Sequence, residues 1–286
     1  MPYNILLEKY NNIELKELNG GYTNKVVLLN GSNPQVIAKI FNKHQYNNFS
    51  VQNEINALLL LGNVKISPKL HDYFEDDDYV YIIMDYINGI NGQTFLDKND
   101  IDKARIIYQL LGFHLAKDIH SIKHEKHGNK LSILKLENVE NNVLGFVPKK
   151  LREKVKNILN INIIEEYTLI HGDFGPHNII YSNDTITAID WEWAGWGNPL
   201  QDIAWVVWFV HLHYPNLCNE LTNIFLKAYY SNKKIQITEE MIKAYLVNKI
   251  INIIKLIKDE DNDSKNEWNR RLEWTIGHNF IENIEV

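Results

Sequence analysis

The chain has 286 residues, of which 45% are hydrophobic and 23% charged, and its formal net charge is −6. This balance is typical of a globular protein with a sizeable core and excludes a disordered or fibrous chain. The negative charge disfavours nucleic acid as a partner, because phosphate backbones are bound by basic surfaces. Cys218 is the one cysteine, so no disulfide can form within the chain, which suits a reducing compartment.

No segment predicts a membrane span or a secretory signal. The longest apolar candidate, Ile203 to Val210, is shorter than the roughly 18 residues that a spanning helix needs. The N-terminus, Met1-Pro2-Tyr3-Asn4, has no basic segment followed by an apolar one. We therefore expect a soluble, cytoplasmic protein without a membrane partner.

The first ninety residues are typical of strands around one helix. Apolar and alternating stretches predict five strands, at residues 13–18, 25–29, 35–41, 70–74 and 79–84. A helix is expected over residues 50–61, ending at Gly62. In the third strand, Lys39 should face opposite to Ala38 and Ile40. The order β-β-β-α-β-β predicts an antiparallel sheet that carries one helix.

After Asn88-Gly89 the pattern becomes helical. Helices are predicted over residues 102–122, 149–160, 201–214, 216–230, 238–258 and 264–282. The last begins with Ser264-Lys-Asn-Glu267, a capping-box pattern. A β-like stretch with a loop in its middle, Thr168 to Asp190, interrupts these helices. We expect an α+β fold of two lobes, a strand-rich lobe at residues 1–87 and a larger helical lobe at residues 88–286.

The segment that is most specific for a function is the loop His171-Gly-Asp173-Phe-Gly-Pro-His-Asn178, which Asp190 follows twelve residues later. Phosphoryl transfer needs a carboxylate that orients an attacking hydroxyl and accepts its proton. It also needs oxygen ligands for Mg²⁺ ions that neutralise a triphosphate. Asp173 can supply the first, and Asn178 with Asp190 can supply the second.

His-Gly-Asp-x₄-Asn followed by Ile-Asp resembles the phosphotransferase motif of the aminoglycoside phosphotransferase and choline kinase superfamily. These are small-molecule kinases with a protein-kinase-like fold, and the resemblance extends from about Leu18 to Trp205. It implies an Mg²⁺-dependent O-phosphotransferase with ATP or GTP as phosphoryl donor. Asp173 would be the catalytic base, and Asn178 and Asp190 would bind Mg²⁺.

The resemblance also assigns residues to the nucleotide. Lys39 in Val-Ile-Ala-Lys would hold the α- and β-phosphates, and Glu54 would be its ion-pair partner. The phosphate-covering loop would be residues 19–24, which depart from the protein-kinase pattern G-x-G-x-x-G. The remaining contacts would come from Gly20 and Gly21 in that loop and, at the purine edge, from the backbone of Asp85 and Ile87.

The catalytic loop and the region after it differ from those of protein kinases. The loop has Gly172 where protein kinases carry arginine, and no Ala-Pro-Glu segment follows Asp190. A small-molecule acceptor is therefore favoured over a protein. By the same resemblance, His171 would support the catalytic loop through hydrogen bonds, and Asp202 would brace it from the following helix.

Several other residues allow two interpretations. Trp193 and Trp196 follow the metal aspartate and either border the acceptor pocket or belong to the core, whereas Trp205 and Trp208 are interpreted as core. The acidic stretch at residues 259–263 is a solvated loop or a site for substrate amines. Three histidines have helix-compatible spacing without a set of metal ligands, and we interpret them as a solvated helix end: His120, His124 and His127.

The acceptor has several candidates. The first is an aminoglycoside or a similar aminated molecule, because of the His-Gly-Asp triplet and the acidity of the chain. The second is choline or ethanolamine, because Asp190-Trp-Glu-Trp is similar to a choline kinase segment whose rings could form a cation–π cage. Both make the acceptor cationic. A sugar or homoserine-type kinase of the same superfamily is a third candidate, and a nucleotide-binding, pseudokinase-like module is the alternative of another class.

Overall fold

The structure is a computed structural model that describes residues 2–18, 25–44, 48–62, 64–124, 130–136, 145–163, 166–258 and 261–281. The strands are β1 (Glu14–Leu18), β2 (Lys25–Asn30), β3 (Val36–Asn42), β4 (Leu70–Glu75), β5 (Tyr79–Asp85), β6 (Ile90–Asn91), β7 (Ile133–Leu134), β8 (Thr168–Ile170), β9 (Ile179–Ser182), β10 (Thr185–Ala188) and β11 (Gly195–Gly197). The α-helices are α1 (Asn4–Lys9), α2 (Asn48–Leu61), α3 (Gln93–Asp97), α4 (Ile101–His114), α6 (Arg152–Leu159), α7 (Leu200–His213), α8 (Cys218–Tyr230), α9 (Glu239–Leu256) and α10 (Asn262–Gly277). Shorter helical turns are η1 (Leu115–Ile119), η2 (Lys149–Leu151), η3 (Pro176–Asn178) and η4 (Trp191–Trp193).

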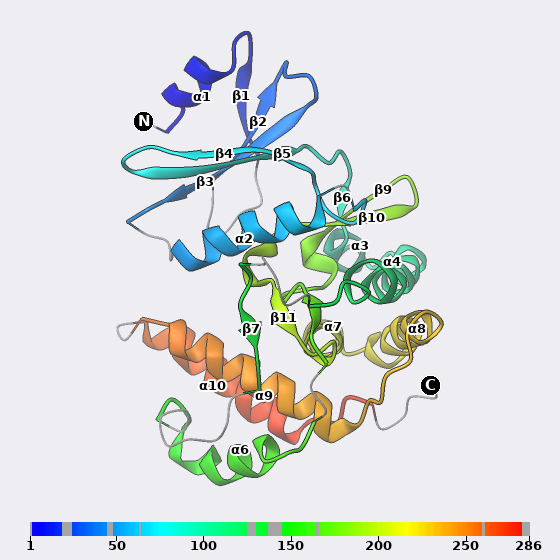
Figure 1. The fold of residues 1–286 in the computed structure, drawn as a ribbon. Coiled ribbons are helices and arrows are strands. Elements are labelled where there is room, and N and C mark those ends of the chain that lie inside the picture. The colour runs from blue at the N-terminus through cyan, green and yellow to red at the C-terminus, as the bar shows by residue number, and fades with distance from the viewer. Residues whose placement is uncertain are drawn as a thin grey trace.

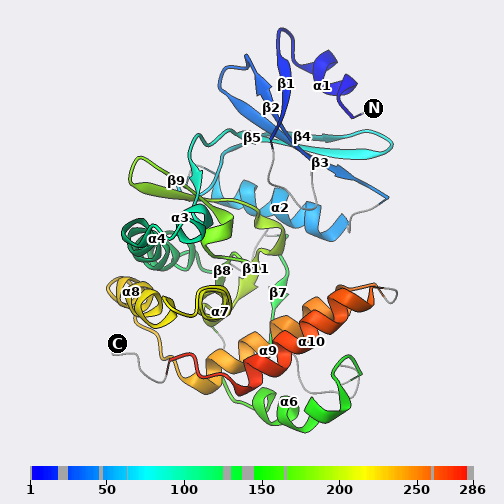
Figure 2. The same ribbon diagram turned by 180° about the vertical axis from the view of Figure 1, so that it is seen from behind.

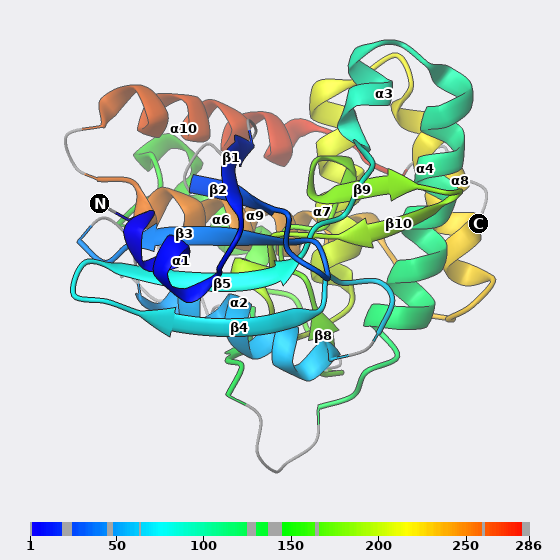
Figure 3. The same cartoon turned by 90° about the horizontal axis from the view of Figure 1, so that it is seen from above.

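An antiparallel sheet of five strands, in the order β1-β2-β3-β5-β4, forms the N-terminal part, and its strands lie side by side above α2 (Figure 3). Side chains alternate between its two faces. Ala38 and Ile40 pack with Leu6 of α1 in a small core on the outer face. Lys39 therefore faces the opposite way, toward α2, as the alternation predicts.

A larger core fills the rest of the molecule. It begins on the inner face of the sheet, with Phe41 and Ile82, and continues through α2 into the helical part, where Trp191 and Trp208 belong to the same cluster. Figures 1 and 2 show the sheet and α2 at one end and helices α4, α7, α8, α9 and α10 at the other. Two small sheets carry the segments before and after Asp173: β10-β9-β6 lies beside α2 and above α3 and α4, and β7-β11-β8 lies below α2 (Figure 1).

This architecture confirms the predicted α+β class, with an N-terminal antiparallel sheet and a helical C-terminal part. The lobe boundaries at residues 1–87 and 88–286 stay a prediction. In the described part of the chain, no helix combines the length and the apolar character needed to cross a membrane.

Two helix predictions were wrong in detail, and one helix was not predicted. The helix expected over residues 102–122 ends as α4 at His114 and continues as a π-helix, η1. The capping box at Ser264 does not form, because α10 starts earlier and Asp261 accepts the backbone N–H of Ser264 at 3.0 Å. The helix α1 was not predicted, since six residues give too short a pattern to identify.

Candidate active site

The loop that carries Asp173 is held between two small sheets. Strand β8 leads into it and pairs with β11, and the turn η3 leads out of it into β9, which pairs with β10. The backbone N–H of Ile189, just after β10, donates to the carbonyl oxygen of Asn178 at 2.9 Å. This bond places Asp190 next to Asn178, as the sequence predicts for a strand that returns to the loop.

The carboxylate of Asp173 has a fixed orientation. The amide of Asn178 donates to its Oδ2 at 2.9 Å, and the indole N–H of Trp205 donates to its Oδ1 at 2.6 Å. Burial alone would raise the pKa of Asp173, but His177, Lys249 and His171 oppose this and lower the pKa to about 2. Asp173 is therefore an oriented carboxylate that is ionised at neutral pH.

Asn178 and Asp190 together offer oxygen ligands for a hard cation. The side-chain amide nitrogen of Asn178 donates to Asp173. The side-chain oxygen of Asn178 is the atom that could bind a cation. Asp190 has a left-handed backbone conformation, with φ of 67°, a strained geometry that recurs at functional sites. No cluster of three or more His, Cys, Asp or Glu side chains suited to a metal exists among the described residues. An amide and a carboxylate oxygen fit Mg²⁺, which keeps water and substrate phosphates as its other ligands.

Lys39 bridges the sheet to the loop after β10. Its Nζ lies 2.6 Å from Glu54 on α2 and 2.6 Å from Asp190. Lys39 and Glu54 are 7% and 1% exposed, so this ion pair is shielded from solvent. Burial alone would lower the pKa of Lys39, but the carboxylates of Glu54 and Asp190 raise it above the ordinary value, so that Lys39 stays charged.

Asp202, in the first turn of α7, is hydrogen-bonded to the backbone of the loop. Its two oxygens accept the N–H groups of His171 and Gly172, both at 2.8 Å. The ring of His171 accepts from the N–H of Asp173 through Nδ1 and therefore donates through Nε2 to the carbonyl of Ile189, at 3.0 Å. His171 is buried, and burial lowers its pKa, so that the ring is neutral.

Gly172 is required where it stands. Its φ is +80°, and a Cβ at this position would lie 2.2 Å from the carbonyl oxygen of Trp193. That neighbour is backbone, and Asn53 of α2 holds the same segment by donating to the carbonyl of Ala194 at 2.8 Å. The arginine found here in protein kinases would not fit.

Three contributors to the site were not predicted from the sequence. Trp205, interpreted as core, is indeed buried but uses its N–H on Asp173. His120 is fully buried and lies 3.2 Å from Asp202, so its interpretation as part of a solvated helix end was wrong, because the chain folds back over it. Lys249 was overlooked, and its signal was a lysine within the apolar run of α9.

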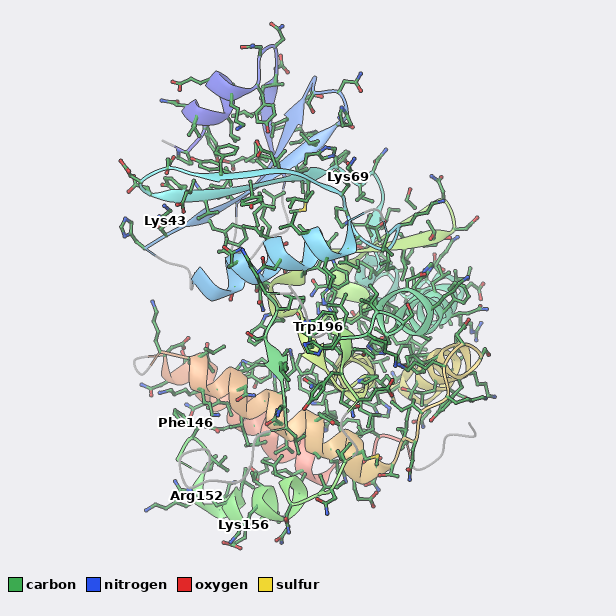
Figure 4. All side chains as sticks on the ribbon, viewed as in Figure 1. Lys43, Lys69, Phe146, Arg152, Lys156 and Trp196 are labelled. Carbon is green, nitrogen blue, oxygen red and sulfur yellow. The ribbon has the colours of Figure 1, made fainter. Side chains whose placement is uncertain are left out.

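The remaining predicted residues are placed as follows. Trp193 is half-buried, whereas Trp196 is 1% exposed and lies in the interior of the helical part (Figure 4). The N–H of Asp85 donates to the carbonyl oxygen of Lys69 at 3.0 Å, and Ile87 follows in the connection out of β5. Gly20 and Gly21, His127 and residues 259–260 lie outside the described residues.

Known proteins resemble this chain in sequence. The model of the phosphotransferase enzyme family, APH, matches residues 14–230. A protein of Metamycoplasma hominis named Protein LicA homolog is 27% identical over 215 residues, which are 74% of this chain and 76% of the relative.

Solved structures share the fold at low sequence identity. The amicoumacin kinase hAmiN, in complex with AMP-PNP, Ca2+ and Ami, superposes with a TM-score of 0.65 at 14% identity and covers 100% of this chain and 96% of its own. An ethanolamine kinase of Plasmodium vivax gives a TM-score of 0.64 at 16% identity and covers 96% of this chain and 85% of its own.

Proposed function

Because this chain belongs to the phosphotransferase enzyme family, we propose that it transfers the γ-phosphoryl group of a nucleoside triphosphate to a hydroxyl group of a small molecule. The observation that carries this proposal is that one site contains an oriented carboxylate, Asp173, and a buried ion pair, Lys39 with Glu54. Asp190 connects the two, because it contacts Lys39 and follows the strand that returns to the loop of Asp173. These groups come from four separate segments of the chain, and phosphoryl transfer uses all of them.

Asp173 acts on the acceptor in this proposal. The acceptor oxygen bonds to the γ-phosphorus, the bond from that phosphorus to the bridging oxygen of the donor breaks, and the nucleoside diphosphate leaves. The acceptor proton passes to the carboxylate of Asp173, whose low pKa keeps it free to accept a hydrogen bond from the hydroxyl. The N–H of Trp205 and the amide of Asn178 hold the carboxylate in one orientation, so that the hydroxyl is directed at the phosphorus.

Lys39 positions the donor. Its ammonium would bind the α- and β-phosphates, and Glu54 would keep it aimed at them from α2. Asn178 and Asp190 would hold Mg²⁺, which when bound neutralises charge on the triphosphate. His171 and Asp202 would support the loop through the hydrogen bonds described above.

The purine would meet the end of β5. The carbonyl of Asp85 and the backbone of Ile87 are the groups we assign to its edge, with Gly20 and Gly21 over the phosphates. ATP is the donor we propose first and GTP the second. The backbone groups at Asp85 and Ile87 could bond the edge of either purine, so they do not by themselves decide between the two. AMP-PNP in the complex of the amicoumacin kinase supports an adenine nucleotide.

The acceptor is a small molecule with a hydroxyl group. The fold shared with an amicoumacin kinase and an ethanolamine kinase supports this class. The sequence places an aminoglycoside-type molecule first and choline or ethanolamine second, with Trp193 as the residue that would border the acceptor. Trp196 is not proposed for that role, because it is buried in the core.

The test is transfer from labelled ATP and GTP, with Mg²⁺, to a panel of aminoglycosides, macrolides, choline, ethanolamine and simple sugars. The matched control is Asp173→Asn, which removes the base and keeps the shape. We expect kcat to fall by roughly 10²–10⁴, the usual share of general acid–base catalysis, with nucleotide affinity unchanged. An unchanged kcat would refute the role of Asp173, and nucleotide binding without transfer to any acceptor would indicate a pseudokinase-like module.

A further inference from the structure

The side chain of Lys249 reaches the loop that carries Asp173 from α9. It lies on α9, which packs against α7 below β11 (Figures 1 and 2). Its Nζ donates to the carbonyl oxygen of Gly172, the residue before Asp173. The side chain of Lys249 therefore ends next to the residue proposed as the base.

The ammonium of Lys249 occupies an aromatic site. It lies 4.6 Å from the ring centre of Trp193 and 4.7 Å from that of Trp205. Trp205 is the residue whose N–H orients Asp173. Burial lowers the pKa of Lys249 below its ordinary value, and the nearby carboxylates of Asp173, Asp202 and Glu192 oppose this by attracting the ammonium. Two indole faces, a carbonyl oxygen and nearby carboxylates are the groups that proteins use to bind an organic cation.

We propose that Lys249 is the resident cation of the acceptor site, so that the acceptor is a neutral alcohol, of the polyol or sugar kind, without an ammonium group beside its reacting hydroxyl. This inference rests on the proposed phosphoryl transfer. A substrate ammonium would have to share the two indole faces with the ammonium of Lys249. Two positive charges in contact with the same rings repel each other strongly where water is excluded. A neutral acceptor avoids that repulsion. Its hydroxyl oxygens can accept hydrogen bonds from the N–H groups of Lys249 that do not bind Gly172.

This inference reorders the acceptors that the sequence left open. Trp193, which would form part of a cage for choline, is already in contact with Lys249. The aminated acceptors therefore fall behind the sugar-type acceptor, which carries hydroxyl groups and no charge. Specificity here comes from a repulsive element as well as from attractive contacts.

The first experiment measures binding and needs no turnover. Tetramethylammonium is titrated into the protein saturated with AMP-PNP and Mg²⁺, and the heat of binding is recorded. The variants are Lys249→Met, which removes the charge at similar length, and Lys249→Arg, which keeps it. Lys255→Met is the matched control, because Lys255 lies on the same helix and contacts Asn252.

We expect no saturable binding to the wild type, to Lys249→Arg or to Lys255→Met. Lys249→Met should bind tetramethylammonium saturably, with an affinity at least roughly tenfold above the weakest that the titration of the wild type would detect, the size expected for a desolvated cation–π contact. Saturable binding to the wild type would overturn the proposal by itself, even if Lys249→Met did not fold. A folded Lys249→Met that gains no binding would overturn it as well, and the thermal shift caused by AMP-PNP tells whether that variant is folded.

The second experiment sorts the acceptor panel by charge. We expect the best acceptor of the wild type to be neutral around the phosphorylated hydroxyl, and a cationic best acceptor would overturn the inference. A panel without any transfer would count against the proposed function, whereas tetramethylammonium binding would still decide the role of Lys249. The two failures are therefore distinguishable.

Discussion

Trp205 shows how much one side chain can contribute to the carboxylate that we propose as the base, Asp173. It is 5% exposed and stacks on Trp208, with ring centres 4.5 Å apart, so its ring is part of the core. Its N–H nevertheless points at Asp173, at 2.6 Å. A hydrogen bond to a charged group contributes more than one between neutral groups, and this bond also fixes which way the carboxylate faces.

Trp205→Phe should lower kcat while leaving the KM for ATP unchanged. The substitution removes the N–H and keeps an aromatic ring, so that Asp173 loses one hydrogen bond. A hydrogen bond to a charged group contributes about 1.5–3 kcal/mol, which corresponds to a decrease in rate of roughly tenfold to a hundredfold. Steady-state kinetics with the best acceptor of the panel measures this change.

The matched control for this variant is Trp208→Phe. The N–H of Trp208 donates to Thr275 at 2.8 Å, away from Asp173. This variant should lose thermal stability, because the buried hydroxyl of Thr275 loses the N–H that donates to it, and should keep the wild-type kcat. Equal losses of kcat in both variants would mean that Trp205 acts through packing and not through its hydrogen bond.

At the scale of elements, α7 supports the loop that carries Asp173. Asp202 lies in its first turn and accepts hydrogen bonds from two backbone N–H groups of the loop. The ring of His120 lies 3.2 Å from the same carboxylate. All three groups are shielded from water by the surrounding core. The loop therefore depends on one buried carboxylate at the start of α7 for two of its backbone hydrogen bonds.

Asp202→Ala should destabilise the protein by roughly 2–5 kcal/mol, because it leaves two buried N–H groups without an acceptor. Denaturant unfolding with a constant m-value measures this change. Asp102→Ala is the control, since Asp102 is exposed and pairs with Arg105 on the surface of α4. That variant should change the free energy of unfolding by less than about 0.5 kcal/mol. A similar effect of both substitutions would contradict the assigned role of Asp202.

The sequence predicted the sheet, α2 and the segment around Asp173, because each has a local pattern. Alternation placed Lys39 and Ala38 on opposite faces of β3, and the spacing from Asn178 to Asp190 indicated a returning strand. Lys249 and His120 could not be placed in this way, since their partners lie far away in the chain and depend on how α9 and η1 pack. Helix ends were also uncertain, as the cap at Asp261 shows, because several polar residues compete to cap one turn.

At the scale of the molecule, the sheet and the helical part share one core. Phe41 and Ile82 of the sheet belong to the same cluster as Trp208 of α7. Lys39 adds a polar link, since it joins Glu54 on α2 to Asp190 in the segment after β10. The proposed nucleotide site is thus formed by groups from both parts.

Nucleotide should stabilise the whole molecule only when Mg²⁺ is present. At a concentration one hundred times its Kd, AMP-PNP should raise the free energy of unfolding by about 2.7 kcal/mol, visible as an increase of Tm. Addition of EDTA should abolish the increase, and Asp190→Ala should not show it. Asp184→Ala, in the turn between β9 and β10, is the control and should respond like the wild type. The same increase of Tm with EDTA would contradict the assignment of Asp190 and Asn178 to a metal.

The two ion pairs of Lys39 have a thermodynamic consequence for the nucleotide. In the free protein its ammonium lies 2.6 Å from each of two carboxylates. In the proposed function, a phosphate oxygen that approaches Lys39 meets an ammonium whose three N–H groups already serve two carboxylates. The affinity for the donor therefore reports how well the phosphate competes with Glu54 and Asp190, and not the full strength of one isolated ion pair.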